Sequence, residues 1–347
     1  MKTIRNVEGV SRRAVLGAGA ATAVTFMLPA TARATETVRF ASVGGLTDAG
    51  LYLADEFGYF KEEGITLEVK RMSNAPALVT ALATNQLDVA GIAVTPALFT
   101  SAEQGIKLRI VGDKQSYRPG FAATRVVVRS SIAKATPAET AKILPGKTIA
   151  VSARASSSFY NAIQILNLHG VDIKQMTVKE LAFPAMLAAL TSGAIDAAYI
   201  IEPYLSRVLH DKIAVEFGNA VEVSGAKGSI AVPLVYSEDF CAKRDVAQSF
   251  MNAYIRGVRA YNDAFLHGKD KDKIQEIMAR RAGVSIDVIR NTYPAGLDPN
   301  QDIDLDSIRD MYKFFLDNKF ITAGAHLDKL VDLSFAKAAV QKYGRYQ

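Results

Sequence analysis

The chain has 347 residues and a formal net charge of +6, from 41 lysines and arginines against 35 aspartates and glutamates. Five of the basic residues and one acidic residue fall within the first 34 positions, so the rest of the chain has 36 basic and 34 acidic residues, a net charge of +2. This balance gives no reason to expect a nucleic-acid or membrane-surface partner. The single cysteine, Cys241, excludes an intrachain disulfide and a metal site of the multi-cysteine type.

The first 34 residues have the features of a cleavable export signal. Paired arginines at 12–13 precede a weakly apolar, Ala/Gly-rich stretch at 14–30, and Ala-Arg-Ala at 32–34 has the small-x-small pattern of a cleavage site. The apolar stretch is marginal in length for crossing a bilayer. The paired arginines indicate the twin-arginine route, with the general secretory route left open. We therefore expect export to the periplasm and cleavage after about Ala34.

Strand-like and helical segments alternate after this signal. Val38–Val43 and Ile65–Met72 are predicted strands, and between them Leu53, Phe57 and Phe60 fall on one face of a predicted helix. The remaining length is enough for two domains. The alternation predicts a parallel or mixed α/β sheet.

An internal repeat indicates two similar lobes. PALVTALATNQLDVA at 76–90 returns as PAMLAALTSGAIDAA at 184–198, at a constant offset of 108 residues. Each copy predicts an apolar helix, a turn, and an aspartate that opens a short apolar strand. Predicted strands at 148–152 and near 175–181 repeat the upstream pattern. A period of about 110 residues is too long for a solenoid unit, so two α/β lobes are the simpler interpretation.

Two further β-type segments, 123–129 and 229–237, are predicted to be the hinge strands. They place lobe one at 35–124, lobe two at 125–228, and the return to lobe one with C-terminal helices at 229–347. The helical part includes one apolar stripe that is typical of a core-facing helix, formed by Val246, Phe250, Tyr254, Gly257, Tyr261 and Phe265.

Four segments carry a family resemblance, in family order and over most of residues 37–220: LYLADEFGYFKEEGITLEV, ALATNQLDVAGIAVTPAL, LPGKTIAVS and ALTSGAIDAAYIIEPYL. They resemble the binding-protein family that serves sulfonate, taurine, nitrate and thiamine-precursor importers. The resemblance implies an α/β fold of the type-II periplasmic binding protein class, with two lobes joined by two hinge strands and a ligand cleft between them. It also implies delivery of a small molecule to an ABC permease in the inner membrane, and we expect a monomer.

The same family contains a yeast-type enzyme that makes a thiamine pyrimidine. That branch is similar in having a cysteine-rich segment and histidines used in its chemistry. This chain has one cysteine and four scattered histidines, and it has neither a G-x-S-x-G nor an H-E-x-x-H motif. We therefore expect no enzyme activity, no cofactor and no metal.

Ligands of open α/β sheets bind outside the carboxyl ends of the strands, so the strand-to-helix loops are predicted to line the cleft. The candidate ligand contacts in lobe one and at the hinge are Gly45, Thr47, Asp48, Ser73, Asn74, Val94, Thr95 and Tyr117. Those in lobe two are Arg154, Ser156, Ser157, Phe183, Glu202 and Tyr204.

The lobe-two candidates favour an anion. Ser156 and Ser157 open a predicted helix, whose free N–H groups and partial positive charge suit an anion, and Arg154 can add a charge-assisted contact. Each has a structural alternative: serines cap helices, and Arg154 can form a surface ion pair. Glu202 can accept from an amine or cap a helix. Phe183 and Tyr204 can form an apolar wall or pack in the core.

These observations predict capture of a small organic anion such as a sulfonate, taurine or a carboxylate. A neutral heterocycle such as a thiamine-precursor pyrimidine is the alternative ligand. An exported enzyme and a ligand-responsive partner of a membrane sensor are the alternative classes of protein. Turnover would distinguish the enzyme, and a receptor-kinase partner would distinguish the sensor.

Overall fold

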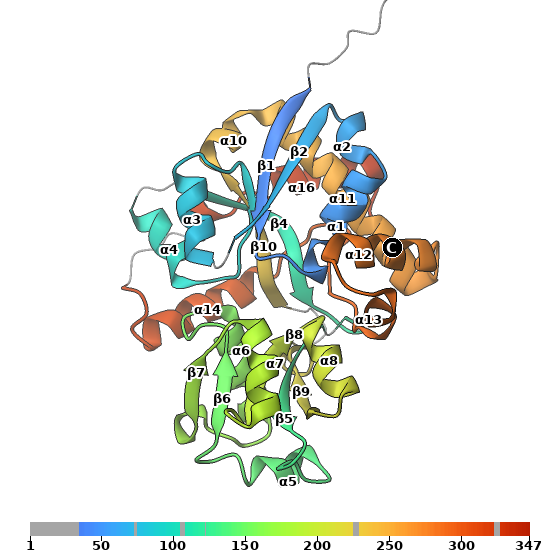
Figure 1. Cartoon of the computed structure of the whole chain (residues 1–347). Helices are drawn as coiled ribbons and strands as arrows, with labels where there is room; N and C mark the ends of the chain where they lie inside the picture. The colour runs from blue at the N-terminus through green and yellow to red at the C-terminus, as the bar shows by residue number, and fades with distance from the viewer. Residues whose placement is uncertain (1–34, 73–74, 105–107, 122, 225–228, 323–326) are drawn as a thin grey trace, which may run out of the picture. The chain divides into compact units, whose positions relative to one another are not determined.

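The computed structural model describes residues 35–72, 75–104, 108–121, 123–224, 229–322 and 327–347 (Figure 1). The predicted export signal at 1–34 and the predicted ligand contacts Ser73 and Asn74 lie outside these residues. Within the described ranges, no helix combines the length and apolar character needed to cross a membrane.

The first sheet has five strands in the order β2-β1-β3-β10-β4. β1 is parallel to both β2 and β3, whereas β10 is antiparallel to β3 and to β4. The carboxyl ends of β1, β2 and β3 therefore lie at one edge of the sheet. The strands are β1 (Glu36–Ser42), β2 (Ile65–Arg71), β3 (Val89–Gly91), β4 (Leu108–Tyr117) and β10 (Ser229–Ser237).

The second sheet repeats this arrangement in the order β7-β6-β8-β5-β9. β6 is parallel to β7 and β8, and β5 is antiparallel to β8 and β9. Figure 1 shows helices α6, α7 and α8 around this sheet, which comes entirely from the middle of the chain. The strands are β5 (Thr124–Arg129), β6 (Thr148–Val151), β7 (Thr177–Glu180), β8 (Ala197–Ile201) and β9 (Ala214–Asn219).

Helices follow the strands of both sheets. Those of the first sheet are η1 (Leu46–Asp48), α1 (Ala49–Glu56), α2 (Tyr59–Glu62), α3 (Ala75–Ala83) and α4 (Pro96–Glu103). Those of the second are α5 (Pro137–Ala141), α6 (Ser157–Leu168), η2 (Ile173–Gln175), α7 (Phe183–Ser192), α8 (Tyr204–His210) and α9 (Ala220–Ser224). The alternating α/β pattern and the predicted strands are confirmed, with ends shifted by one or two residues.

The C-terminal third is helical, as predicted. Its longest helix, α11 (Arg244–His267), buries the predicted apolar stripe, and Phe250, Tyr254 and Tyr261 lie in the core that it shares with α1. The other helices are α10 (Glu238–Ala242), α12 (Lys271–Ala282), α13 (Ile286–Asn291), α14 (Leu305–Asp317), α15 (Leu327–Leu330) and α16 (Ser334–Tyr343).

The aspartate shared by the two repeat copies has the same structural role in each. Asp88 precedes β3 and accepts the backbone N–H of Arg39 at 2.9 Å; Asp196 precedes β8 and accepts that of Thr148 at 3.0 Å. Each carboxylate also pairs with an arginine, Arg39 at 2.7 Å and Arg129 at 2.9 Å. Burial would raise the pKa of both carboxyls, but these hydrogen bonds hold each pKa below its usual value. The repeated aspartate thus fastens neighbouring strands together.

The predicted hinge segments are β5 and β10, and both are interior strands of their sheets. β5 lies between β8 and β9, and β10 lies between β3 and β4. The chain passes from the first sheet to the second between β4 and β5, and it returns between β9 and β10. These two passages join the two sheets.

Candidate functional site

The carboxyl-end edges of the two sheets are joined by direct hydrogen bonds. The Ser157 N–H donates to the carbonyl oxygen of Val94 at 2.9 Å, and the Ser157 hydroxyl donates to the carbonyl oxygen of Ala231 at 3.2 Å. Val94 follows β3 of the first sheet, whereas Ser157 opens α6 after β6 of the second. Two predicted contacts, Val94 and Ser157, therefore meet each other, and the strand-to-helix loops of both lobes come together.

The loop after β1 contains three of the predicted contacts. Gly45 has a φ of 110°, a backbone conformation that side-chain-bearing residues rarely adopt. Asp48 is buried; its carboxylate accepts from the Ser42 hydroxyl at 2.7 Å and pairs with the Lys114 ammonium at 2.7 Å. The same ammonium donates to the hydroxyl of the half-buried Thr47 at 2.8 Å. Thr47 and Asp48 thus share one charged partner.

Lys114, that partner, is a residue that sequence reasoning missed. It lies on β4, where Asp113 and Lys114 place two adjacent charges inside a mostly buried strand. Charged side chains are seldom fully buried unless they are paired, so this pair was a usable signal. The partner of Lys114 could not be predicted from the sequence, because Asp48 lies 66 residues earlier in the chain.

Thr95 occupies the same edge of the first sheet, at the start of α4. Thr95 is 5% exposed, and its side chain makes no capping hydrogen bond to the helix. Among the described residues, the Thr95 hydroxyl has no hydrogen-bond partner. Leaving a buried hydroxyl unpartnered costs about 1–3 kcal/mol, so this hydroxyl suits a role in binding.

The predicted anion-binding residues of lobe two have partners within the protein. The exposed Arg154 donates to the carbonyl oxygen of Val178 at 2.7 Å and lies 3.7 Å from the Glu180 carboxylate. Ser156 caps α6, accepting from the N–H of Phe159 at 3.4 Å. The structure thus directs Arg154 along β7 and uses Ser156 to begin the helix.

Glu202 is buried at the start of α8. Its carboxylate accepts from the Ser206 N–H at 3.0 Å, the Ser206 hydroxyl at 2.7 Å and the Tyr293 N–H at 2.9 Å. Burial raises the pKa of Glu202, and these hydrogen bonds oppose the rise. The Arg125 guanidinium lies 3.8 Å from the centre of the Tyr293 ring. Glu202 thus caps α8 and ties lobe two to the segment after α13.

The predicted aromatic contacts pack against the core of lobe two. Tyr117, at the end of β4, is buried; its hydroxyl is 2.6 Å from that of Tyr199 and accepts from the Asn161 amide at 3.4 Å. Burial raises the pKa of the Tyr117 phenol. Phe183 and Tyr204 are the first residues of α7 and α8, and both are half-buried against the core of lobe two.

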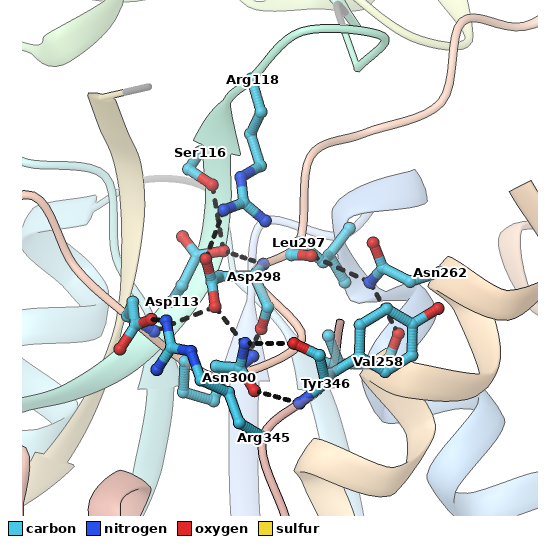
Figure 2. Close-up of polar contacts among 12 residues, drawn as sticks. Asp113, Ser116, Arg118, Val258, Asn262, Leu297, Asp298, Asn300, Arg345 and Tyr346 are labelled. Atoms are coloured by element: carbon cyan, nitrogen blue, oxygen red, sulfur yellow. Dashed lines mark hydrogen bonds and ion pairs between the residues drawn. The ribbon is translucent and has the colours of Figure 1, made fainter. Parts of the chain in front are cut away.

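Asp113, next to Lys114 on β4, belongs to a different cluster (Figure 2). Its carboxylate accepts from the Asp298 N–H at 2.6 Å and from the Ser116 hydroxyl at 3.2 Å, while Arg118 pairs with the Asp298 carboxylate. Burial, and then the Asp298 charge, raise the pKa of Asp113 to about 8. Figure 2 shows this cluster holding the segment around Leu297 and Asp298 against β4.

Cys241 shows no sign of an activated thiol. It lies in α10, half-buried, and burial raises the pKa of its thiol to about 12. The thiol is therefore protonated at neutral pH, whereas the reactive nucleophile of a catalytic cysteine is the deprotonated thiolate. Over the parts of the chain that the structure describes, no group of three or more histidine, cysteine, aspartate or glutamate side chains is arranged to hold a metal ion.

Two similar α/β sheets, with the carboxyl ends of their parallel strands meeting through Val94 and Ser157, define the fold of a type-II periplasmic binding protein. The model of the NMT1-like family matches residues 32–279. The chain therefore belongs to the NMT1-like family.

Relatives named as binding proteins are similar over much of the chain. The taurine-binding periplasmic protein of Escherichia coli (strain K12) is 26% identical over 65% of this chain and 67% of its own length. The putative aliphatic sulfonates-binding protein of Bacillus subtilis (strain 168) is 25% identical over 84% of this chain and 85% of its own. The alkanesulfonate-binding protein SsuA from Xanthomonas axonopodis pv. citri, solved bound to MOPS, superposes with a TM-score of 0.67 at 20% identity and covers 86% of this chain and 99% of its own.

Proposed function

We propose that this chain is the periplasmic solute-binding component of an ABC importer. It captures a small organic anion between its lobes and delivers it unchanged to a membrane permease. The observation that carries the proposal is the meeting of the two strand-end edges at Val94 and Ser157, where each lobe presents its strand-to-helix loops to the other. The names of the taurine- and sulfonate-binding relatives support the choice of an anion.

The proposed ligand contacts come from both edges. In lobe one they are Gly45, Thr47, Asp48, Val94 and Thr95. In lobe two, Phe183 and Tyr204 offer aromatic rings at the first positions of α7 and α8. Arg154, whose guanidinium also contacts Val178 and Glu180, offers a cation. The polar atoms of Tyr117, Ser156, Ser157 and Glu202 are already hydrogen bonded within the protein, so we assign to these residues the positioning of helices and of the hinge.

The proposal extends to location and assembly. Lobe one comprises 35–124 with 229–347, and lobe two comprises 125–228. The chain is exported through the signal at 1–34, acts in the periplasm and works as a monomer without nucleic acid. Binding without turnover is favoured over catalysis because relatives are named for binding and because burial keeps the Cys241 thiol protonated.

A thermal-shift panel tests the proposed function. Taurine, alkanesulfonates, carboxylates, nitrate and pyrimidines would each be added to the purified protein. An organic anion at 100 times its Kd is expected to stabilise the folded chain by about 2.7 kcal/mol, which raises the unfolding midpoint visibly. A rise with one anion that is reduced in Arg154→Ala would place Arg154 in the site. A rise only with pyrimidines would contradict the anion and favour the neutral heterocycle.

A further inference from the structure

Gly91 leaves room for the stem of Lys114 at the strand-end edge. A Cβ on Gly91, the last residue of β3, would lie 2.0 Å from the Cδ of Lys114 and 2.4 Å from its Cε. The lysine stem therefore lies directly over β3. The ammonium reaches Thr47 and Asp48 in the loop after the adjacent strand β1, and the side chains of Lys114 and Asp48 are 3% and 2% exposed.

A second cation approaches the same loop from β2. Arg71 ends that strand, and its Nε lies 3.1 Å from the position that a Cβ on Gly44 would take. The Arg71 side chain also acts on Tyr52, whose hydroxyl donates to Asp48 at 3.4 Å. Burial and the Asp48 charge raise the pKa of Tyr52 to about 12, and Arg71 opposes that rise. Arg71, Tyr52, Asp48 and Lys114 thus form one connected group.

This group holds two cations, Lys114 and Arg71, and one carboxylate, Asp48, which pairs with Lys114, so its formal net charge is +1. Arg281, which also approaches Tyr52, is balanced by its own partner Asp55 at 2.8 Å. An ammonium has three N–H donors, and the acceptors that Lys114 reaches are Thr47 and Asp48. The hydroxyl of Thr47 keeps its own proton to donate, and the unpartnered hydroxyl of Thr95 adds another donor at this edge.

Stability alone does not explain a buried ion pair at this place. Removing two charges from water is costly, and apolar side chains of similar volume commonly serve a protein core as well or better. A pair that lies beside a half-buried threonine, at the end of a sheet where ligands bind, is better explained by recognition of a charged group.

We propose that Lys114 and Arg71, with the hydroxyls of Thr47 and Thr95, form the subsite that binds the acid group of a singly charged ligand, a sulfonate or a carboxylate. Asp48 fixes the Lys114 ammonium and limits the subsite to one net positive charge. A monoanion therefore neutralises it, whereas a neutral head group leaves the positive charge uncompensated. This inference rests on the proposed function and adds two lobe-one cations to the Arg154 cation that the proposed function assigns to lobe two.

Isothermal titration calorimetry with ethanesulfonate and its neutral counterpart ethanesulfonamide tests the subsite. The variants are Lys114→Met, which keeps the stem without the charge, and Arg71→Gln, at an exposed position. Lys114→Met leaves Asp48 buried without its cation, so the double variant Lys114→Met/Asp48→Asn is measured beside it to separate binding from folding. Lys342→Met is the matched control, because that ammonium pairs with Glu63 at 2.8 Å on another part of lobe one.

We expect the wild-type protein to bind ethanesulfonate more tightly than the sulfonamide. Lys114→Met, the double variant and Arg71→Gln should each lose at least about tenfold in sulfonate affinity, as for a lost charge-assisted hydrogen bond, while Lys342→Met loses none. Unchanged sulfonate affinity in the three folded variants would overturn the subsite and leave the proposed function standing. Failure of the wild-type protein to bind ethanesulfonate, acetate or taurine would overturn the subsite together with the anion as substrate.

Discussion

Asp113→Asn is expected to remove the loss of stability that the raised pKa of Asp113 predicts for the wild-type protein between about pH 5 and pH 8. The pKa of Asp113 is raised from 3.8 to about 8 in the folded chain, first by burial and then by the Asp298 carboxylate. Between these two values the folded state keeps a proton that the unfolded chain releases. Stability is therefore highest below the unfolded pKa and falls as pH rises, by up to about 1.4 kcal/mol per pH unit.

The asparagine variant has no such proton, and its side-chain oxygen can still accept from the Asp298 N–H and the Ser116 hydroxyl. Urea unfolding at pH 5, 6, 7 and 8 would measure the free energy of unfolding. The variant should match or fall below the wild type at pH 5 and exceed it by one to a few kcal/mol at pH 8. Asp310→Asn, at an exposed position on α14, is the control. Parallel pH profiles for wild type and Asp113→Asn would show that Asp113 is ionised in the fold.

Gly257→Ala is expected to destabilise the protein by at least about 3 kcal/mol, or to prevent folding, because the new methyl group has no space. A Cβ on Gly257 of α11 would lie 2.1 Å from the carbonyl oxygen of Gly50 and 2.7 Å from the backbone nitrogen of Ala54, both on α1. Backbone atoms cannot turn aside as a side chain can. α1 follows directly from Thr47 and Asp48, so the same change should also weaken ligand binding in any protein that folds.

The sign of the change in stability separates the two explanations. Replacing glycine with alanine inside an exposed helix normally stabilises the helix by about 1 kcal/mol, whereas a clash with α1 would destabilise the protein. Thermal and urea unfolding of Gly257→Ala would measure the change. Ala260→Gly, one turn along α11, is the matched control and should cost only about 1 kcal/mol from helix propensity. An alanine variant as stable as the wild type would show that α1 and α11 do not pack this closely.

Local patterns explain why much of the fold was predictable from the sequence. The strands at β1, β2, β6 and β7 and the stripe of α11 depend on periodicity within short windows, and the repeat shows that one arrangement is used twice. The interior positions of β5 and β10 in their sheets could not be predicted from the sequence. Strand neighbours are chosen by contacts between distant segments, and such contacts leave little trace in a local pattern.

The candidate site was less predictable, for the same reason. Strand-end loops could be located, but the partners of their side chains lie far along the chain. Lys114 reaches Asp48 across 66 residues, and Glu202 accepts from Tyr293 across 91. Arg154 illustrates the limit: the sequence placed a cation beside a helix start, whereas its guanidinium meets the Val178 carbonyl on β7. A side chain's direction depends on neighbours that a motif does not contain.

Native mass spectrometry of the protein incubated with taurine and alkanesulfonates tests the central claim most directly, followed by NMR of the ligand recovered after denaturation. We predict one ligand per chain for at least one of these anions, recovered chemically unchanged after prolonged incubation. A chemically altered ligand would contradict binding without turnover, and the absence of any bound anion at millimolar concentration would contradict anion capture.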